Sequence, residues 1–257
     1  DSKLNNKIID LYKKEGADAW FKYSKEDLLG KDYDANDYAK VDDILDVWFD
    51  SGCTHAFVLE GQQGQIWPAS IYLEGTDQHR GWFHSSLLES CGTRGVAPYE
   101  SVLTHGFVLH EDGAKMSKSS KKIVAPAEVI EKSGADILRL WVASSDYSED
   151  LKIGPEIIKS NVDSYRRLRN TLRFILGNLS EFSEDERIDY NQLNDLDHYI
   201  LSSLVNLEEE VMNNYKIFEY QKVFSLIFNF CTNELSAFYF DIRKDTLYCD
   251  SKNSLDR

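Results

Sequence analysis

The chain has 257 residues, of which 42% are hydrophobic and 28% charged, and these proportions exclude wholesale disorder. Its formal net charge of −15 argues against a protein that coats nucleic acid through general charge attraction, although a local basic face could still bind RNA. No apolar run approaches the roughly 20 residues needed to cross a bilayer, and no secretory signal is visible, so we expect a cytoplasmic protein without membrane contact.

Helix and strand patterns alternate from about residue 41 to about residue 150, and a short helix and a loop precede them over residues 1–40. Apolar residues at helical spacing predict an amphipathic helix over residues 1–16. The apolar run at residues 71–73 predicts a buried strand, and a helical pattern that includes Trp82 follows it. Such alternation favours an α/β domain with a mainly parallel sheet.

A second strand, a loop and two helices are predicted next. Residues 101–110 predict the strand, which turns at Asp112-Gly113 into a lysine-rich loop. Pro126 fits the first position of a helix, where its missing N–H group is not needed. A further helix is predicted over residues 135–143.

The pattern changes after Gly154. Apolar residues recur every three or four positions over residues 158–179 and predict one long amphipathic helix. Two more helices are predicted at about residues 194–214 and 217–242, with no strand signal between them. We therefore expect a domain boundary near residue 153 and an all-α helical bundle over residues 154–257.

The lysine-rich loop carries the most specific motif of the chain, Lys115-Met116-Ser117-Lys118-Ser119. Two lysines three residues apart can present ammonium groups to a polyphosphate, while serine hydroxyls contact its oxygens. An arbitrary pentamer of this composition would be a solvated basic loop. This pentamer, between a strand and a helix that starts with proline, resembles the second signature of class I aminoacyl-tRNA synthetases.

A second motif covers residues 73–83, with the sequence Leu-Glu-Gly-Thr-Asp-Gln-His-Arg-Gly-Trp-Phe. Polar residues at the carboxyl end of a parallel strand lie where open α/β sheets bind ligands. Gly75 would let a nucleotide approach the backbone, Asp77 could accept hydrogen bonds from ribose hydroxyls, and Gln78 could serve a neighbouring polar group. Taken singly, Asp77 or Gln78 is more often a helix N-cap or a surface residue. Taken together, the stretch resembles the ligand-binding turn of isoleucyl-tRNA synthetases.

Two further segments extend this resemblance. Residues 45–52, Leu-Asp-Val-Trp-Phe-Asp-Ser-Gly, resemble the isoleucine-pocket segment of the isoleucyl enzymes, in which Trp48 and Trp82 would be flat apolar walls. Without that context, the segment would be interpreted as an aromatic core beside a Ser-Gly turn. His105 lies near the end of the second predicted strand, and the resemblance gives it a ligand role, although a lone histidine is more often a packed or surface residue.

The resemblance covers nearly the whole chain and implies an isoleucine–tRNA ligase. Such an enzyme activates isoleucine with ATP, releases pyrophosphate and transfers the aminoacyl group to tRNA(Ile). Catalysis would consist of positioning and charge stabilisation at the polyphosphate. The implied ligands and partners are ATP with its Mg²⁺, isoleucine and tRNA(Ile), and we expect a monomer without a metal site built by the protein.

The same resemblance assigns roles to individual residues. Lys118 would stabilise the phosphates during catalysis, and Lys115 would assist it. Trp48 and Trp82 would form the amino-acid pocket. The residues that would bind ATP and hold the aminoacyl-adenylate are Glu74, Gly75, Asp77, Gln78, His105 and Lys118.

The sequence also departs from the family pattern. The His-Ile-Gly-His signature and the editing domain are absent from these residues, so we expect residues 1–153 to be the second half of a Rossmann-type catalytic domain. Residues 154–257 would be the start of the helical anticodon-binding domain. The 257-residue chain alone should therefore not form the adenylate. Lys121 and Lys122 replace the Gly-Asn of many relatives, which adds positive charge and removes a flexible glycine, so we expect loop closure to differ from that of these relatives.

Two alternatives come from different classes of protein. A synthetase for valine or leucine would share the lysine loop, but the runs at residues 48–52 and 74–83 argue against both. A non-catalytic RNA-binding or scaffolding module that kept the sheet but lost the activity is the second alternative, and it depends on the missing upstream signature.

Four arginines in the long helix fit either a solvated face or a tRNA contact: Arg166, Arg167, Arg169 and Arg173.

Overall fold

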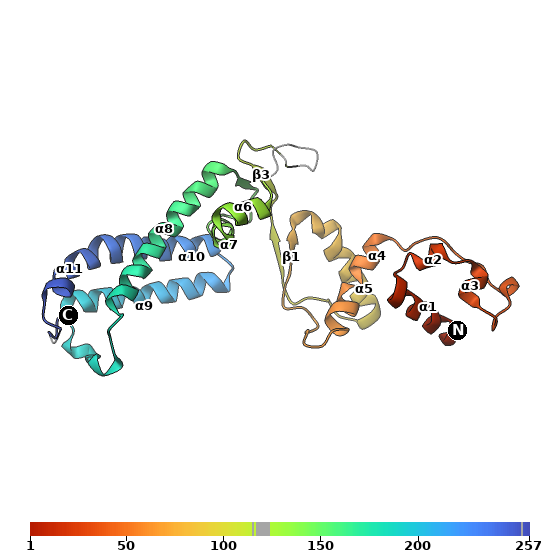
Figure 1. Ribbon diagram of the computed structural model, residues 1–257, viewed down its shortest axis with the longest axis horizontal. Helices are drawn as coiled ribbons and strands as arrows, with labels where there is room; N and C mark the ends of the chain where they lie inside the picture. The colour runs from red at the N-terminus through yellow and green to blue at the C-terminus, as the bar shows by residue number, and fades with distance from the viewer. Residues whose placement is uncertain (115, 117–123, 253) are drawn as a thin grey trace. The chain divides into compact units, whose positions relative to one another are not determined.

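The computed structural model describes residues 1–114, 116, 124–252 and 254–257 (Figure 1). The predicted catalytic residues Lys115 and Lys118 therefore lie outside the described residues. The chain divides into two compact units, of which the first comprises residues 1–70 and 78–101 and the second residues 71–77 and 102–257. No helix in the described part of the chain is long and apolar enough to cross a membrane.

The first unit begins with three helices, α1 (Ser2–Glu15), α2 (Ala19–Lys22) and α3 (Lys25–Leu29). Helix α1 ends where the sequence predicts, because Gly16 has a φ of 82°, a backbone conformation that favours glycine. Asp1 caps its other end, where the carboxylate accepts a hydrogen bond of 2.8 Å from the backbone N–H of Lys3.

The second part of the first unit is a helix pair, α4 (Val47–Gly52) and α5 (Trp82–Arg94), which pack against each other. A π-helix, η2 (His55–Glu60), follows α4 closely. Ser51 and Gly52 belong to the last turn of α4, so this Ser-Gly pair is helical rather than a chain reversal. Both residues also contact α5, Ser51 through Trp82 and Gly52 through Glu89.

The second unit contains two short parallel sheets. Strand β1 (Tyr72–Gly75) pairs with β2 (Val102–His105), and β3 (Val108–His110) pairs with β4 (Leu151–Ile153). The predicted parallel pairing is confirmed. The single strand predicted over residues 101–110 is wrong in one respect, because it is split into β2 and β3, which have different partners.

Close backbone packing at Gly106 explains the split. A Cβ atom added to Gly106 would lie inside van der Waals distance of the Glu149 carbonyl group, and the Gly106 N–H donates to the Tyr147 carbonyl oxygen at 2.9 Å. The chain segment before β4 therefore covers the junction between β2 and β3. Only a residue without a side chain fits there.

We predict that Gly106→Ala lowers the free energy of unfolding by about 1–3 kcal/mol, because the added methyl group must displace the backbone of Glu149. Chemical denaturation compared with the unchanged chain measures this loss. Gly177→Ala is the matched control, since a Cβ added there meets nothing within 4 Å. Equal denaturation midpoints for the two variants would contradict the close contact between Gly106 and the Glu149 backbone.

Helices make up the rest of the second unit. Pro126 and Pro155 stand at the first turns of α6 (Pro126–Ser133) and α8 (Pro155–Asn178), and α7 (Ala135–Ala143) lies between these helices in the chain. These helices agree with the predicted ones to within three residues, because α8 begins three residues before the predicted start at residue 158. Trp141 of α7 is buried, and its indole N–H donates to the Lys152 carbonyl oxygen at 3.1 Å, which ties α7 to β4.

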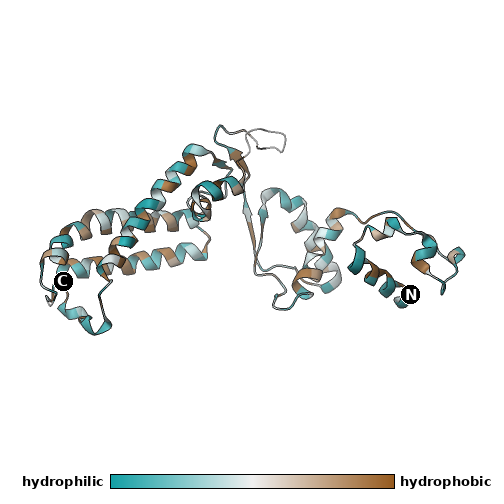
Figure 2. Ribbon diagram, viewed as in Figure 1, coloured by the Kyte–Doolittle hydropathy of each residue, from teal (hydrophilic) through white to brown (hydrophobic). Residues whose placement is uncertain are grey.

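The bundle continues with α9 (Asp195–Lys216), α10 (Tyr220–Asn229), the π-helix η6 (Phe230–Tyr239) and α11 (Phe240–Cys249). Hydrophobic and hydrophilic residues alternate along these helices (Figure 2). Helix α8 packs on η6, where the Thr171 hydroxyl lies 2.8 Å from the Ser236 hydroxyl. The predicted all-α region is confirmed. The remaining short helices are 3₁₀ turns: η1 (Ala35–Asp37), η3 (Thr76–Arg80), η4 (Glu184–Glu186) and η5 (Tyr190–Gln192).

Candidate functional site

Three of the predicted ligand-binding residues meet at the carboxyl ends of β1 and β2. Gly75 and His105 are register partners at the ends of these strands. A Cβ atom on Gly75 would lie 2.7 Å from Oδ1 of Asp77 and 3.9 Å from Cε1 of His105. The missing side chain of Gly75 therefore leaves room for the Asp77 carboxylate beside the His105 ring. We call Gly75, Asp77 and His105 the strand-end cluster.

The imidazole of His105 is held in one orientation. Its Nδ1 lies 2.8 Å from the carbonyl oxygen of Gly106, and because a carbonyl oxygen can only accept, Nδ1 carries the proton. Nε2 of the neutral ring is then a hydrogen-bond acceptor. The residue is partly exposed.

Glu74 lies on the opposite face of β1. Side chains alternate between the two faces of a strand, so Glu74 shares its face with Tyr72, whereas the strand-end cluster lies on the face of Gly75. Glu74 is partly exposed and pairs in register with Thr104. The structure therefore brings together three of the predicted binding residues of this unit and places the Glu74 side chain elsewhere.

The predicted walls of the amino-acid pocket belong to the first unit and lie around Gly81. A Cβ atom on Gly81 would be 3.0 Å from Cη2 of Trp48 and 2.6 Å from Oε1 of Gln78. That same Gln78 oxygen accepts a hydrogen bond of 2.9 Å from the backbone N–H of Trp82. We call Trp48, Gln78, Gly81 and Trp82 the tryptophan cluster. Gln78 thus has a structural role at the start of α5 in addition to its predicted binding role.

Exposure separates the two interpretations of the segment around Trp48. Trp48 is 48% exposed and the neighbouring Phe49 is 47% exposed, so these aromatic side chains do not form a buried core. Trp82 is partly buried, and its indole N–H donates to the Ser51 carbonyl oxygen at 2.9 Å. One tryptophan is therefore fixed by a hydrogen bond while the other presents apolar surface.

A contact from α5 that no motif predicted supports this cluster. The Cys53 thiol donates to Oε2 of Glu89 at 3.0 Å, and the Glu89 carboxylate also lies against Gly52. The hydrogen bond to the Glu89 carboxylate, together with partial burial, raises the pKa of Cys53 to about 11. Cys53 is therefore a protonated thiol at neutral pH rather than a reactive nucleophile.

A closed turn leads into the lysine loop. The backbone N–H of His110 donates to the Ala114 carbonyl oxygen at 3.0 Å, and that of Gly113 donates to the His110 carbonyl oxygen at 2.8 Å. The Asp112 carboxylate lies 3.0 Å from Nδ1 of His110 and accepts from the backbone N–H of Ala114. The start of the loop is thus fixed at the end of β3.

The arginine group of α8 is exposed along its whole length. Arg166 lies 3.4 Å from the Asp163 carboxylate, one turn earlier in the helix, which is a surface ion pair of little energetic weight. The helix therefore presents a basic face. The residues of this face are Arg166, Arg167, Arg169 and Arg173.

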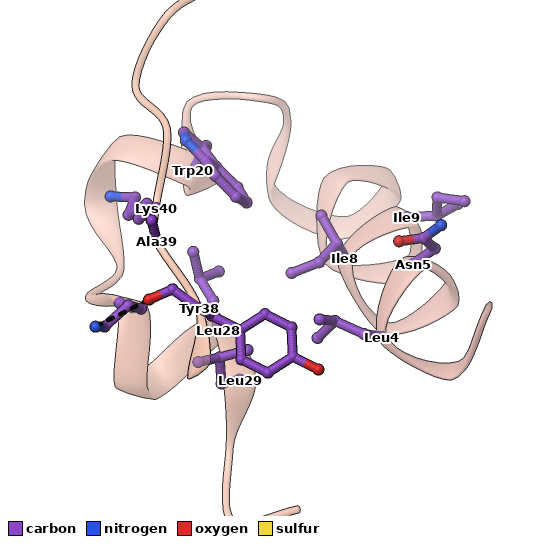
Figure 3. Close-up of a pocket in the computed structure, with 11 residues that line it drawn as sticks. Leu4, Asn5, Ile8, Ile9, Trp20, Leu28, Leu29, Tyr38, Ala39 and Lys40 are labelled. Atoms are coloured by element: carbon purple, nitrogen blue, oxygen red, sulfur yellow. Dashed lines mark hydrogen bonds between the residues drawn. The ribbon is translucent and has the colours of Figure 1, made fainter. Parts of the chain in front are cut away.

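A cavity of about 350 Å³ lies among the N-terminal helices and includes none of the residues in the two clusters. Leu4, Ile8, Trp20, Leu28 and Tyr38 point toward this space (Figure 3). Its lining is mainly apolar and shows no arrangement for catalysis. Among the described residues, no group of three or more histidine, cysteine, aspartate or glutamate side chains is placed to hold a metal ion.

Comparisons with known proteins connect these clusters to a family. A model of the family described as tRNA synthetases class I (I, L, M and V) matches residues 1–154, and a model of the anticodon-binding domain of tRNA ligase matches residues 197–257. The isoleucine–tRNA ligase of Pelagibacter ubique (strain HTCC1062) is 55% identical over 99% of this chain, which corresponds to 28% of that protein. The isoleucine–tRNA ligase of Zymomonas mobilis subsp. mobilis is 54% identical over 97% of this chain and 27% of that protein. The chain thus spans little more than a quarter of the length of these relatives.

Solved structures share the fold. Agrobacterium radiobacter K84 agnB2 LeuRS, in a ternary complex with tRNA and LeuAMS, matches 77% of this chain and 28% of that chain with a TM-score of 0.67 at 18% identity. Mycobacterium tuberculosis methionyl-tRNA synthetase in complex with methionyl-adenylate matches 79% of this chain and 40% of that chain with a TM-score of 0.59 at 22% identity. The predicted fold class is confirmed. With a family model over residues 1–154 and relatives more than half identical over nearly its whole length, the chain belongs to the class I tRNA synthetases (I, L, M and V).

Proposed function

We propose that this chain is part of an isoleucine–tRNA ligase, which activates isoleucine with ATP and transfers the aminoacyl group to tRNA(Ile). The observation that carries the proposal is the high identity, over nearly the whole chain, to relatives named isoleucine–tRNA ligase. The full-length protein would act as a monomer in the cytoplasm, with Mg²⁺ bound to the ATP substrate.

The strand-end cluster supplies groups suited to a nucleotide. In the proposed reaction, Asp77 accepts hydrogen bonds from ribose hydroxyls, and Gly75 lets the nucleotide approach the strand backbone. Nε2 of His105 offers an acceptor beside them, since Nδ1 is bound to the Gly106 carbonyl group. Glu74 lies on the opposite face of β1 and is not part of this cluster, so its role in nucleotide binding stays a prediction from the motif alone. These groups bind and orient the substrate, and none of them needs to form a covalent bond with it.

The tryptophan cluster supplies apolar surface for the amino-acid side chain. Trp82 is fixed by hydrogen bonds at its backbone and its indole nitrogen, and Trp48 is about half exposed. A branched aliphatic side chain would bury area against both rings. Gln78 holds the first turn of α5, so it orients Trp82 as well as serving the proposed ligand.

Lys118 and Lys115 would stabilise the phosphates. Both lie outside the described residues, and their roles rest on the Lys-Met-Ser-Lys-Ser motif. The turn at residues 110–114 fixes the point where this segment leaves β3. Residues 154–257 would begin the anticodon-binding region, and the basic face of α8 gives it side chains that can contact RNA phosphates.

Amino-acid-dependent exchange of pyrophosphate into ATP by the full-length protein tests the proposed function. We expect kcat/KM for isoleucine to exceed that for valine by roughly 10- to 200-fold, the range that one methylene allows, a value known from enzymes of this family rather than taken from this structure. Leucine and methionine should support less exchange still. Higher activity with any of these three amino acids would contradict the isoleucine assignment.

The non-catalytic alternative predicts a different result of the pyrophosphate exchange assay. A module that only binds RNA would retain tRNA binding but support no exchange with any amino acid. Chelation of Mg²⁺ separates the two further, because it should abolish exchange by the proposed ligase. Tight tRNA binding with no exchange at saturating Mg²⁺ and ATP would favour the binding module.

A further inference from the structure

The last turn of α4 is fixed to α5 by the side chain of Glu89. The Cys53 thiol donates to Oε2 of Glu89 at 3.0 Å. The same carboxylate lies against Gly52, since a Cβ atom there would be 2.5 Å from Oε1 and 2.7 Å from Oε2. Any residue larger than glycine at position 52 would push the carboxylate away. The two helices are therefore in direct contact at this point.

Neighbouring contacts fix the same turn. The Ser51 carbonyl oxygen accepts from the Trp82 indole N–H at 2.9 Å, and the Gly52 carbonyl oxygen lies 3.0 Å from Nδ1 of the buried His55. Trp82 and Glu89 are seven residues apart in α5, so they lie on one face of that helix, two turns apart. This face of α5 therefore contacts residues 51–53 at two separate points.

Trp48 lies one turn before these contacts. The Ser51 hydroxyl donates to the Trp48 carbonyl oxygen at 3.2 Å, and both residues belong to α4. A helix of six residues moves nearly as a rigid body, so a shift of its last turn also moves Trp48. The spacing between Trp48 and Trp82 consequently depends on the contacts at residues 51–53.

We propose that Glu89 is a positioning residue of the amino-acid pocket, which holds the end of α4 against α5 and so sets the spacing of Trp48 and Trp82. The proposal rests on the proposed function, in which these two rings contact the isoleucine side chain. Glu89 acts through α4 and does not itself touch the substrate. Its loss should therefore affect amino-acid recognition much more than the chemical step.

Glu89→Ala in the full-length protein tests this role. We expect the KM for isoleucine to rise by about tenfold or more, with kcat and the KM for ATP within about twofold of the unchanged enzyme. The preference for isoleucine over valine should fall, because a looser pocket distinguishes one methylene less well. Pyrophosphate exchange with each amino acid measures all four quantities.

Matched variants separate positioning from a general loss of structure. Glu89→Gln should behave almost like the unchanged enzyme, since its amide oxygen can still accept from Cys53. Glu100→Ala removes an exposed carboxylate from the same unit and should have no effect. If Glu89→Ala does not fold, Cys53→Ala removes the same hydrogen bond, and an unchanged KM for isoleucine in that variant would overturn the proposal.

Alkylation of Cys53 by iodoacetamide checks the contact independently of activity. The Glu89 carboxylate accepts the hydrogen bond of the Cys53 thiol and disfavours the thiolate by its charge, so Glu89→Ala, which removes both effects, should speed alkylation at pH 8 by at least about tenfold. The exposed Cys91 of α5 provides an internal reference, and its rate should not change. An unchanged Cys53 rate would show that the thiol and carboxylate are not in contact, and would overturn the proposal.

The results also distinguish failure of the positioning role from failure of the proposed function. Isoleucine-dependent exchange by the unchanged protein, combined with an unchanged KM and isoleucine preference in Glu89→Ala, would remove Glu89 from the pocket while leaving the ligase assignment intact. Absence of isoleucine-dependent exchange in the unchanged protein would instead reject the ligase assignment.

Discussion

Replacing Lys118 by alanine in the full-length protein should lower the rate of isoleucine activation by about two to three orders of magnitude. The negative charge on the triphosphate shifts toward the leaving pyrophosphate as the reaction proceeds. A lysine ammonium group placed there stabilises the transition state more than bound ATP, so its loss should reduce kcat. Single-turnover formation of the adenylate measures this rate directly.

Isoleucine affinity should change much less in the same variant. The amino-acid side chain is assigned to the tryptophan cluster, which contains no lysine, so calorimetric titration with isoleucine should give a Kd within a few-fold of the unchanged enzyme. Lys132→Ala removes an exposed lysine of α6 and is the matched charge control. An unchanged activation rate for Lys118→Ala would remove this lysine from the mechanism.

Helix boundaries were predicted well because their signals are local. Gly16 ends α1 through its own backbone conformation, and Pro126 starts α6 because of its own ring geometry. The long α8, which has 24 residues, was predicted from apolar residues at regular spacing over residues 158–179. Each of these signals lies within one helical turn or within one element, where sequence patterns are most informative.

Features that depend on distant residues were missed. The break between β2 and β3 follows from the approach of the Glu149 backbone to Gly106, and β4 has only three residues and no apolar run of its own. The helix predicted over residues 217–242 is wrong at its start, because Phe218 has a φ of 62° and α10 begins at Tyr220. This helix also contains the π-helical stretch η6, which helical spacing alone did not predict.

The candidate site shows the same difference between local sequence signals and contacts that join distant residues. Its residues were predicted from motifs within short stretches of sequence, but the contacts that organise them join distant positions. Trp82 reaches back 31 residues to the Ser51 carbonyl group, and Cys53 contacts Glu89 across 36 residues. Glu89 interrupts an otherwise neutral stretch of α5, which is the only trace of its role in the sequence. Motifs therefore identified candidate ligand-binding groups, whereas the structure identified the hydrogen bonds that hold these groups in place.

Substitution of Asp77 in the strand-end cluster should have the second large effect on activity. Asp77→Ala should lower kcat/KM for ATP by about a hundredfold, because a buried ribose hydroxyl would lose a charged acceptor. Asp77→Asn keeps an acceptor oxygen and should lose less. The KM for isoleucine should change little in either variant. Pyrophosphate exchange at varied ATP, with isoleucine saturating, measures the effect.

Gly75→Ala should produce a similar loss through the same carboxylate. Its methyl group would lie 2.7 Å from Oδ1 of Asp77, too close for either atom to remain in place, so Asp77 must move away from its position beside His105. The effects of Gly75→Ala and Asp77→Ala should therefore not add, because the first variant acts largely by displacing the group that the second removes.

The double variant makes this argument quantitative. If Gly75→Ala acts only through Asp77, then Gly75→Ala/Asp77→Ala should have nearly the same kcat/KM for ATP as Asp77→Ala alone. Fully additive losses would mean that Gly75 acts only through its other proposed role, in which the missing side chain lets the nucleotide approach the strand backbone. Gly177→Ala, where a Cβ meets nothing within 4 Å, controls for the general effect of the substitution on folding. The cycle thus tests whether the glycine serves the carboxylate or the ligand.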